Sequence, residues 1–106
     1  MLDADAIYQR LLTAGETWTD LSAAAQALDL AAETMAAREF LTSPGNIEER
    51  KALSKTSEPY QELRTAALTA WAKANKARVK YDTARVYCDM LRTVESTRRA
   101  EIEKGL

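Results

Sequence analysis

The sequence predicts an all-α protein, and three observations support this prediction. Of its 106 residues, 46% are hydrophobic, and much of that fraction is alanine, the residue with the highest helix propensity. Only three glycines and two prolines are available to interrupt helices. Along two long stretches, apolar residues recur at alternating steps of four and three, the spacing of a helix that packs along another helix. We therefore expect an elongated antiparallel helical hairpin, in which a short connecting helix joins two long helices. A dimeric four-helix bundle of two such hairpins is the alternative.

The first long helix is expected over residues 4–42. Asp3 is placed to cap its start, because a side-chain oxygen there accepts hydrogen bonds from free backbone N–H groups. Ser43-Pro44-Gly45 is placed to end it, since proline disfavours helix at the preceding residue and glycine allows the turn. A break near Gly15 stays open as an alternative, although the apolar seam keeps its register there. That seam consists of Ile7, Leu11, Ala14, Trp18, Leu21, Ala25, Leu28, Ala32 and Met35.

A short helix over residues 47–54 and a second long helix over residues 58–104 complete the single predicted domain. Asn46 and Glu49 form a capping pattern for the short helix, whose apolar face is expected to be Ile47, Ala52 and Leu53. The second seam is Leu63, Ala67, Ala70, Ala74, Ala77, Tyr81, Ala84, Cys88 and Leu91. We expect the alanines to let the two backbones approach closely. The large core residues are expected to be Trp18, Leu21, Leu28, Met35, Leu63 and Leu91.

A second apolar stripe lies on the other side of the second long helix, at Val79, Val86, Met90 and Val94. The hairpin does not need this stripe in order to fold. The short connecting helix is one candidate to cover it. A second protomer or another protein is the other, and we predict that these four residues bind such a partner.

Charge is divided unevenly along the chain. Residues 1–50 hold three basic and nine acidic residues, a net charge of −6, whereas residues 51–106 hold twelve basic and seven acidic residues, a net charge of +5. The basic residues expected to contact nucleic acid or an acidic partner are Lys73, Lys76, Lys80, Arg92, Arg98 and Arg99. The alternative is a ladder of ion pairs within the helix, since Asp82, Asp89 and Glu103 alternate with Arg78, Arg85, Arg92 and Arg99.

The composition contains few of the residue types that catalysis or metal binding requires. There is no histidine, the commonest general base and metal ligand, and the glycines are isolated rather than grouped in a phosphate-binding loop. Cys88 is the only cysteine, so no internal disulfide is possible, and its seam position indicates a buried, inert thiol. We expect no enzyme activity, cofactor, metal or small-molecule substrate. The absence of a long apolar run and of a basic leader predicts a cytoplasmic protein that does not bind membranes.

The second half also resembles a group of proteins. Tyr81-Asp82, the mid-helix Asp89-x-x-Arg92-Thr93 and the closing Thr97-Arg98-Arg99-Ala100-Glu101 are similar to the C-terminal helix of small uncharacterised phage and prophage accessory proteins. The resemblance implies a phage accessory protein located in the host cytoplasm. The absence of catalytic residues, the second apolar stripe and the uneven charge favour a protein that acts without catalysis by binding protein, as an adaptor or as an inhibitor of a host complex, for example in counter-defence such as an anti-CRISPR. The alternatives are a nucleic-acid-binding accessory of phage recombination or packaging, and a structural assembly component.

Overall fold

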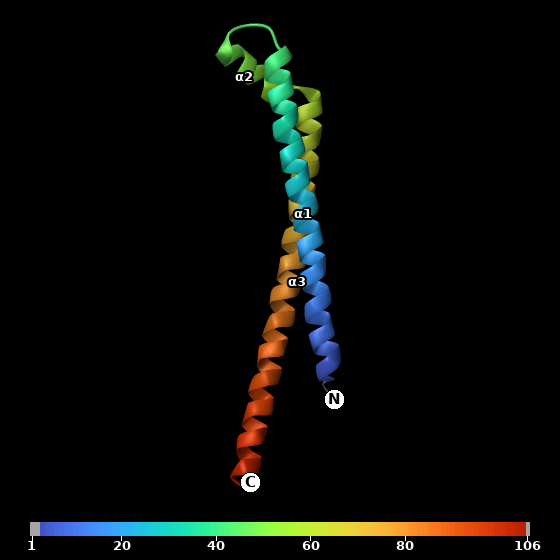
Figure 1. The fold of residues 1–106 in the computed structure, drawn as a ribbon, viewed down its shortest axis with the longest axis vertical. Helices are drawn as coiled ribbons and strands as arrows, with labels where there is room; N and C mark the ends of the chain where they lie inside the picture. The colour runs from blue at the N-terminus through green and yellow to red at the C-terminus, as the bar shows by residue number, and fades with distance from the viewer. Residues whose placement is uncertain (1–2, 106) are drawn as a thin grey trace. The chain divides into compact units, whose positions relative to one another are not determined.

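A computed structural model describes residues 3–105 and confirms the all-α prediction. Helix α1 spans Ala4–Thr42, α2 spans Ile47–Thr56 and α3 spans Glu58–Glu103 (Figure 1). Helix α1 is continuous through Gly15, so the alternative of a break there is wrong. The chain divides into two compact units, to which both long helices contribute. Unit 1 combines residues 1–18 with residues 75–106, and unit 2 is residues 19–74.

Side-chain caps begin all three helices. The carboxylate of Asp3 accepts hydrogen bonds from the backbone N–H groups of Asp5 and Ala6 at 3.0 and 3.4 Å. Asn46 accepts from Glu49 N–H at 2.9 Å, and the Ser57 hydroxyl accepts from Tyr60 N–H at 3.4 Å. These oxygens satisfy N–H groups that have no partner inside their own helix.

The turn between α1 and α2 depends on Gly45. Its φ of 104° lies in the left-handed region that a residue with a Cβ rarely adopts. The Gly45 carbonyl accepts a hydrogen bond from Arg50 Nε at 3.0 Å, which joins the turn to α2. The predicted end of α1 before Ser43-Pro44-Gly45 therefore follows from backbone geometry as well as from the missing N–H of proline.

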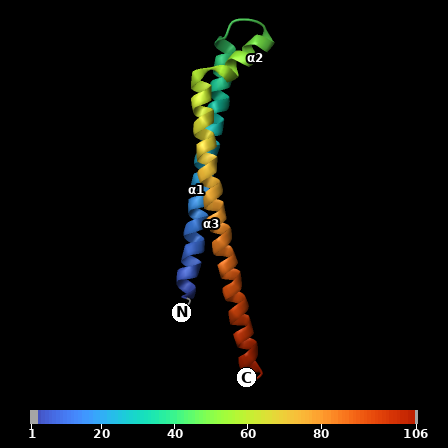
Figure 2. The same cartoon turned by 180° about the vertical axis from the view of Figure 1, so that it is seen from behind.

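In unit 2, α1 and α3 pack through small residues. They lie side by side in two opposite views (Figure 1 and Figure 2). Ala25 and Ala32 of α1, and Ala67 and Ala74 of α3, are buried. Because alanine has only a methyl side chain, the two helices can approach closely along this line. The predicted role of the alanines is therefore supported.

In unit 1, the start of α1 packs antiparallel to the second part of α3. The Cys88 thiol lies 3.9 Å from the carbonyl oxygen of Ile7, and the rings of Trp18 and Tyr81 lie 5.2 Å apart between centroids. Later residues of α1 therefore meet earlier residues of α3. The Tyr81 ring lies over Gly15, where a Cβ would sit 3.4 Å from a ring carbon. Cys88 is buried, as the seam predicted.

Two predictions about the core are wrong in part. Of the six large residues expected in the core, Leu91 alone is buried, and the other five are half-buried. Two packed helices enclose the centre of their seam only, so alanine and Cys88 fill that centre while larger side chains extend to its edge.

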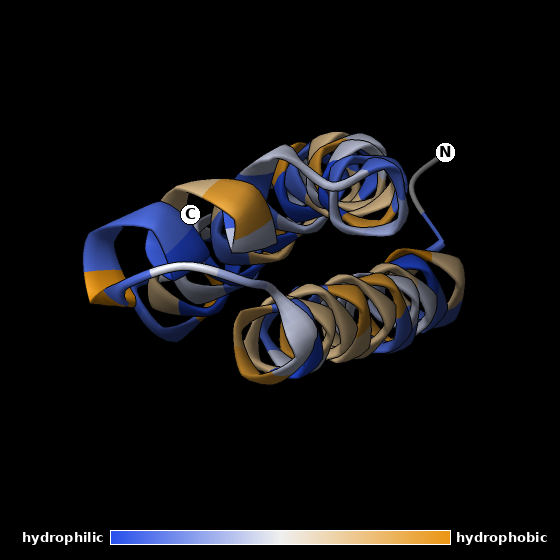
Figure 3. Cartoon of the chain, turned by 90° about the horizontal axis from the view of Figure 1, so that it is seen from above, coloured by the Kyte–Doolittle hydropathy of each residue, from blue (hydrophilic) through white to orange (hydrophobic). Residues whose placement is uncertain are grey.

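The expected apolar face of α2 is exposed. The buried residue of α2 is Ser54, whose hydroxyl donates to the Lys51 carbonyl. Figure 3 shows that each helix mixes hydrophobic and hydrophilic positions, as expected for helices with one packed face.

Candidate interaction surface

The apolar stripe predicted for partner binding is exposed on α3 within unit 1. The exposed fractions are 60% for Val79, 52% for Val86, 58% for Met90 and 59% for Val94. At about 100° per residue, these positions fall within roughly a quarter-turn of one another, with Val79, Val86 and Met90 opposite the seam and Val94 at the edge of the group. The structure therefore places the four residues together on one face and leaves them open to solvent.

Threonines complete this face and make it longer. Thr83, Thr93 and Thr97 fall at the remaining positions of the same register, so Val79, Thr83, Val86, Met90, Thr93, Val94 and Thr97 form a face without charge, here named the outer strip. The Thr83 hydroxyl donates to the Val79 carbonyl at 2.9 Å, and the Thr93 hydroxyl donates to the Asp89 carbonyl at 3.0 Å. Since these hydroxyl protons are used within the helix, the two threonines contribute largely their methyl groups to the surface.

The surface of the outer strip is uneven. One shallow hollow is lined by Val86, Met90, Thr93, Val94 and the neighbouring Asp89. A second begins at Thr93 and Val94 and continues past Thr97 to Arg98 and Glu101. Depressions between successive side chains are the features into which side chains of another helix insert.

The six basic residues predicted to contact nucleic acid or an acidic partner are all exposed. Lys73 belongs to unit 2, and the other five belong to unit 1. Within unit 1 they do not form one patch, because Arg92 and Arg99 lie on a different side of α3 from Lys76, Lys80 and Arg98 at about 100° per residue. The structure therefore brings no more than two of these basic residues together at any one place.

The expected ladder of ion pairs is almost absent from the described part of the chain. Arg85 Nη2 lies 4.0 Å from Asp82 Oδ1, and both side chains are more than half exposed. The other ion pair within 4.0 Å among residues 3–105 joins Arg64 to Asp29 across the two helices of unit 2. None of the six basic residues is therefore neutralised by an acid within that distance.

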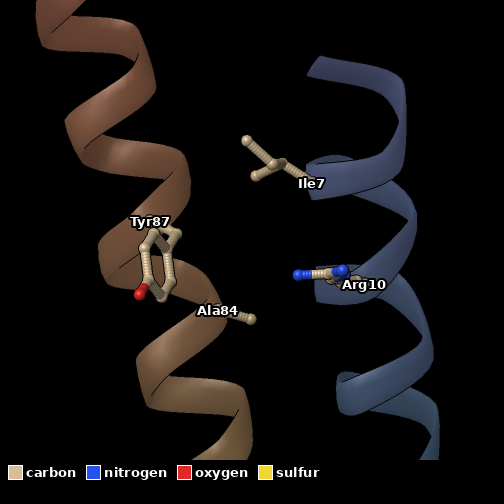
Figure 4. Close-up of a pocket in the computed structure, with 4 residues that line it drawn as sticks. All are labelled: Ile7, Arg10, Ala84 and Tyr87. Carbon is tan, nitrogen blue, oxygen red and sulfur yellow. The ribbon is translucent and has the colours of Figure 1, made fainter. Parts of the chain in front are cut away.

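A third feature, which sequence reasoning missed, is a hollow of about 200 Å³ in unit 1 lined by Ile7, Arg10, Ala84 and Tyr87. Ile7 and Arg10 of α1 extend toward α3, where Ala84 and Tyr87 lie (Figure 4). Its walls are apolar with a single cation, Arg10, which has no ion pair to a described residue. The sequence carried no signal for this hollow, because it depends on how the two helices are aligned.

Sequence reasoning also missed the hydrogen-bonding role of Asp29. Its carboxylate accepts from Arg64 Nη1 at 2.9 Å and from Trp71 Nε1 at 2.7 Å. Both residues are tied to α1 through this one acid, so their role in unit 2 is structural.

Residues 3–105 contain no group of three or more side chains of the metal-ligating types cysteine, aspartate and glutamate close enough to hold a metal ion. Within the same range, no helix combines the length and apolar character needed to cross a membrane. Comparison of the chain with models of protein families, with characterised proteins and with solved structures gives no match.

Proposed function

We propose that this chain is a non-enzymatic interaction protein that binds an amphipathic helix of another protein on the outer strip of α3. The observation that carries the proposal is the length of this uncharged face. From Val79 to Thr97 the outer strip itself holds no charged residue, with Asp82 and Asp89 along one edge, although charged residues make up 29% of the chain. An adaptor or an inhibitor of a larger complex would use such a face.

A continuous apolar face is unfavourable when it is exposed to water. Isolated apolar residues are common on protein surfaces, but a continuous apolar face is expected to be covered by another element. The outer strip has the register of four and three residues that helix packing requires. Burying its valines and methionine would contribute roughly 25 cal/mol for each Å² of apolar surface removed from water.

Val86→Asp tests the proposal, because Val86 lies near the middle of the outer strip. The immobilised wild-type chain should capture a partner from a lysate of the source cell, and Val86→Asp should lose that partner, since an unpaired charge in an apolar contact is strongly unfavourable. Leu12→Asp is the matched control, because Leu12 is exposed to a similar extent on α1 of the same unit. Circular dichroism should show equal helix content in all three proteins. A partner that survives Val86→Asp would show that the outer strip is not the binding face.

A second candidate function is nucleic-acid binding, which we infer from the unpaired basic residues. None of the six has an acid within 4.0 Å among the described residues. Against it, Asp82, Asp89, Glu95, Glu101 and Glu103 lie on the same helix and would repel phosphates. Binding of labelled duplex DNA at low and moderate salt decides the matter. A phosphate-tracking surface should bind at low salt with a steep loss of affinity as salt rises, and no binding at low salt would exclude it.

A further inference from the structure

The hollow between α1 and α3 in unit 1 combines apolar walls with one cation. Its volume is about 200 Å³, and the residues that line it, Ile7, Arg10, Ala84 and Tyr87, all belong to unit 1. Figure 4 shows Arg10 extending from α1 toward Ala84 and Tyr87 of α3. No acid among residues 3–105 lies within 4.0 Å of the Arg10 guanidinium. The guanidinium therefore borders apolar side chains without a counter-charge from the described part of the chain.

We propose that this hollow binds a small aromatic monocarboxylate of about the size of benzoate. The molecule would be a ligand and not a substrate. The proposal goes beyond the proposed function, and the hollow shares no lining residue with the outer strip. Binding of a carboxylate and capture of a protein partner are separate measurements, so either proposal can fail while the other holds.

Charge complementarity identifies the polar end of the ligand. A guanidinium is a planar fork of donors that matches the two oxygens of a carboxylate, with which it forms two parallel hydrogen bonds. Arg10 is the one basic residue that lines the hollow. It therefore balances the charge of a monocarboxylate, whereas a phosphate group, with a charge of about −1.5 to −2 at neutral pH, would stay partly uncompensated.

Size and wall chemistry identify the apolar end. An apolar cavity of about 150 Å³ is large enough to hold benzene, so about 200 Å³ has room for one aromatic ring and a carboxylate. Tyr87 is 56% exposed, which leaves part of its ring free to contact a second ring in an offset or edge-to-face arrangement. Ile7 supplies an aliphatic contact, and Ala84 leaves open the space that a larger side chain would fill.

Titration of the isotope-labelled 106-residue chain with sodium benzoate, at constant ionic strength and followed by two-dimensional NMR, tests the proposal. We expect saturable shifts of the backbone amides of Ile7, Arg10, Ala84 and Tyr87, with a dissociation constant on the order of a millimolar. Acetate carries the charge without the ring, and benzyl alcohol carries the ring without the charge. Each should bind about tenfold more weakly or less, and so should inorganic phosphate.

Three variants locate the site. Arg10→Gln should raise the dissociation constant for benzoate about tenfold or more, because it removes the cation and its paired donors. Arg78→Gln is the matched control, since it makes the same change in net charge at an exposed position of unit 1, about 180° round α3 from Tyr87. It should leave the dissociation constant unchanged. Ala84→Leu should abolish binding by filling the hollow, and circular dichroism should show equal helix content in all variants.

Arg10→Gln decides the matter by itself if Ala84→Leu disturbs the fold, because Arg10 is exposed and its loss leaves the packing intact. Shifts that do not saturate at tens of millimolar benzoate would overturn the proposal. An equal response to acetate and benzoate, or an equal effect of Arg10→Gln and Arg78→Gln, would reduce the binding to general attraction of anions and overturn it as well. A folded Ala84→Leu chain that binds benzoate like the wild type would show that the ligand lies elsewhere.

Discussion

Asp29 joins α1 to α3 in unit 2, and its replacement by alanine should destabilise the protein by about 2–3 kcal/mol relative to a matched surface variant. Asp29→Ala removes the acceptor of Trp71 Nε1, 2.7 Å away in a partly buried position. A hydrogen bond to a charged group contributes about 1.5–3 kcal/mol, and the indole N–H would be left without that acceptor. The pair with Arg64 adds little, roughly 0.2–1 kcal/mol at most, because 47% of the Arg64 side chain is exposed.

Urea denaturation followed by circular dichroism measures this free energy. Asp20→Ala is the control, since Asp20 lies on the same helix in unit 2, is exposed, and makes no side-chain hydrogen bond or ion pair to a described residue. Both variants gain the same helix propensity, so the difference between them isolates the contacts of Asp29. Asp29→Asn separates the two contacts, because the amide oxygen can still accept from Trp71 while the charge that attracts Arg64 is lost. We expect Asp29→Asn to cost about 1 kcal/mol.

The unfolding midpoint should shift while its dependence on urea concentration stays unchanged, as expected when stability alone changes. If Asp29→Ala unfolds at the same urea concentration as Asp20→Ala, the two hydrogen bonds contribute nothing to folding. If Asp29→Asn is as costly as Asp29→Ala, the charge of Asp29 matters more than the acceptor for Trp71, and the ranking of the two contacts is wrong.

Two further substitutions examine how closely the helices approach. Gly15→Ala should raise the free energy of unfolding by about 0.5–1 kcal/mol, because alanine favours helix over glycine and the new Cβ would meet the Tyr81 ring at ordinary contact distance. A lowered thermal midpoint would instead show that the ring cannot accommodate the methyl group. Ala67→Leu should destabilise by about 1–3 kcal/mol, since Ala67 is fully buried between α1 and α3 and a larger side chain would force the helices apart. Ala72→Leu, at an exposed position of the same unit, should be nearly neutral, and equal melting temperatures for the two leucine variants would contradict close packing at Ala67.

The helices and their ends could be predicted from sequence because local chemistry decides them. The helix caps are local: each side-chain oxygen of Asp3, Asn46 and Ser57 accepts a hydrogen bond from a backbone N–H group two or three residues further along the chain. The positive φ of Gly45 is equally local, because a residue without a Cβ adopts it without steric conflict. The boundaries of α1 agree with the prediction, whereas α2 ends two residues later and α3 one residue earlier than expected. Helix ends depend on weak final hydrogen bonds, so differences of this size are ordinary.

The candidate sites were predictable to different extents. The register alone located Val79, Val86, Met90 and Val94 on one face, because helical geometry converts spacing into direction. It did not reveal which acid pairs with Arg64, since a contact between residues 29 and 64 depends on how two helices are aligned. The register also predicted a ladder of ion pairs along α3. In the described residues one of these pairs forms, the 4.0 Å contact between Arg85 and Asp82. Charged side chains on an exposed helix gain little from pairing, because water solvates them nearly as well.

By itself, the sequence determined that this protein forms two long helices with a short one between them, and which face of each long helix packs. Every position of both predicted seams is buried or half-buried, because a period of four and three residues leaves a helix one apolar side to bury. The tertiary structure alone decided how deeply each residue is buried, with alanines at the centre and larger residues at the edge. It also decided that Asp29 binds Arg64 and Trp71, and that Ile7, Arg10, Ala84 and Tyr87 line a hollow. These features depend on the alignment and separation of two helices, which no local pattern encodes.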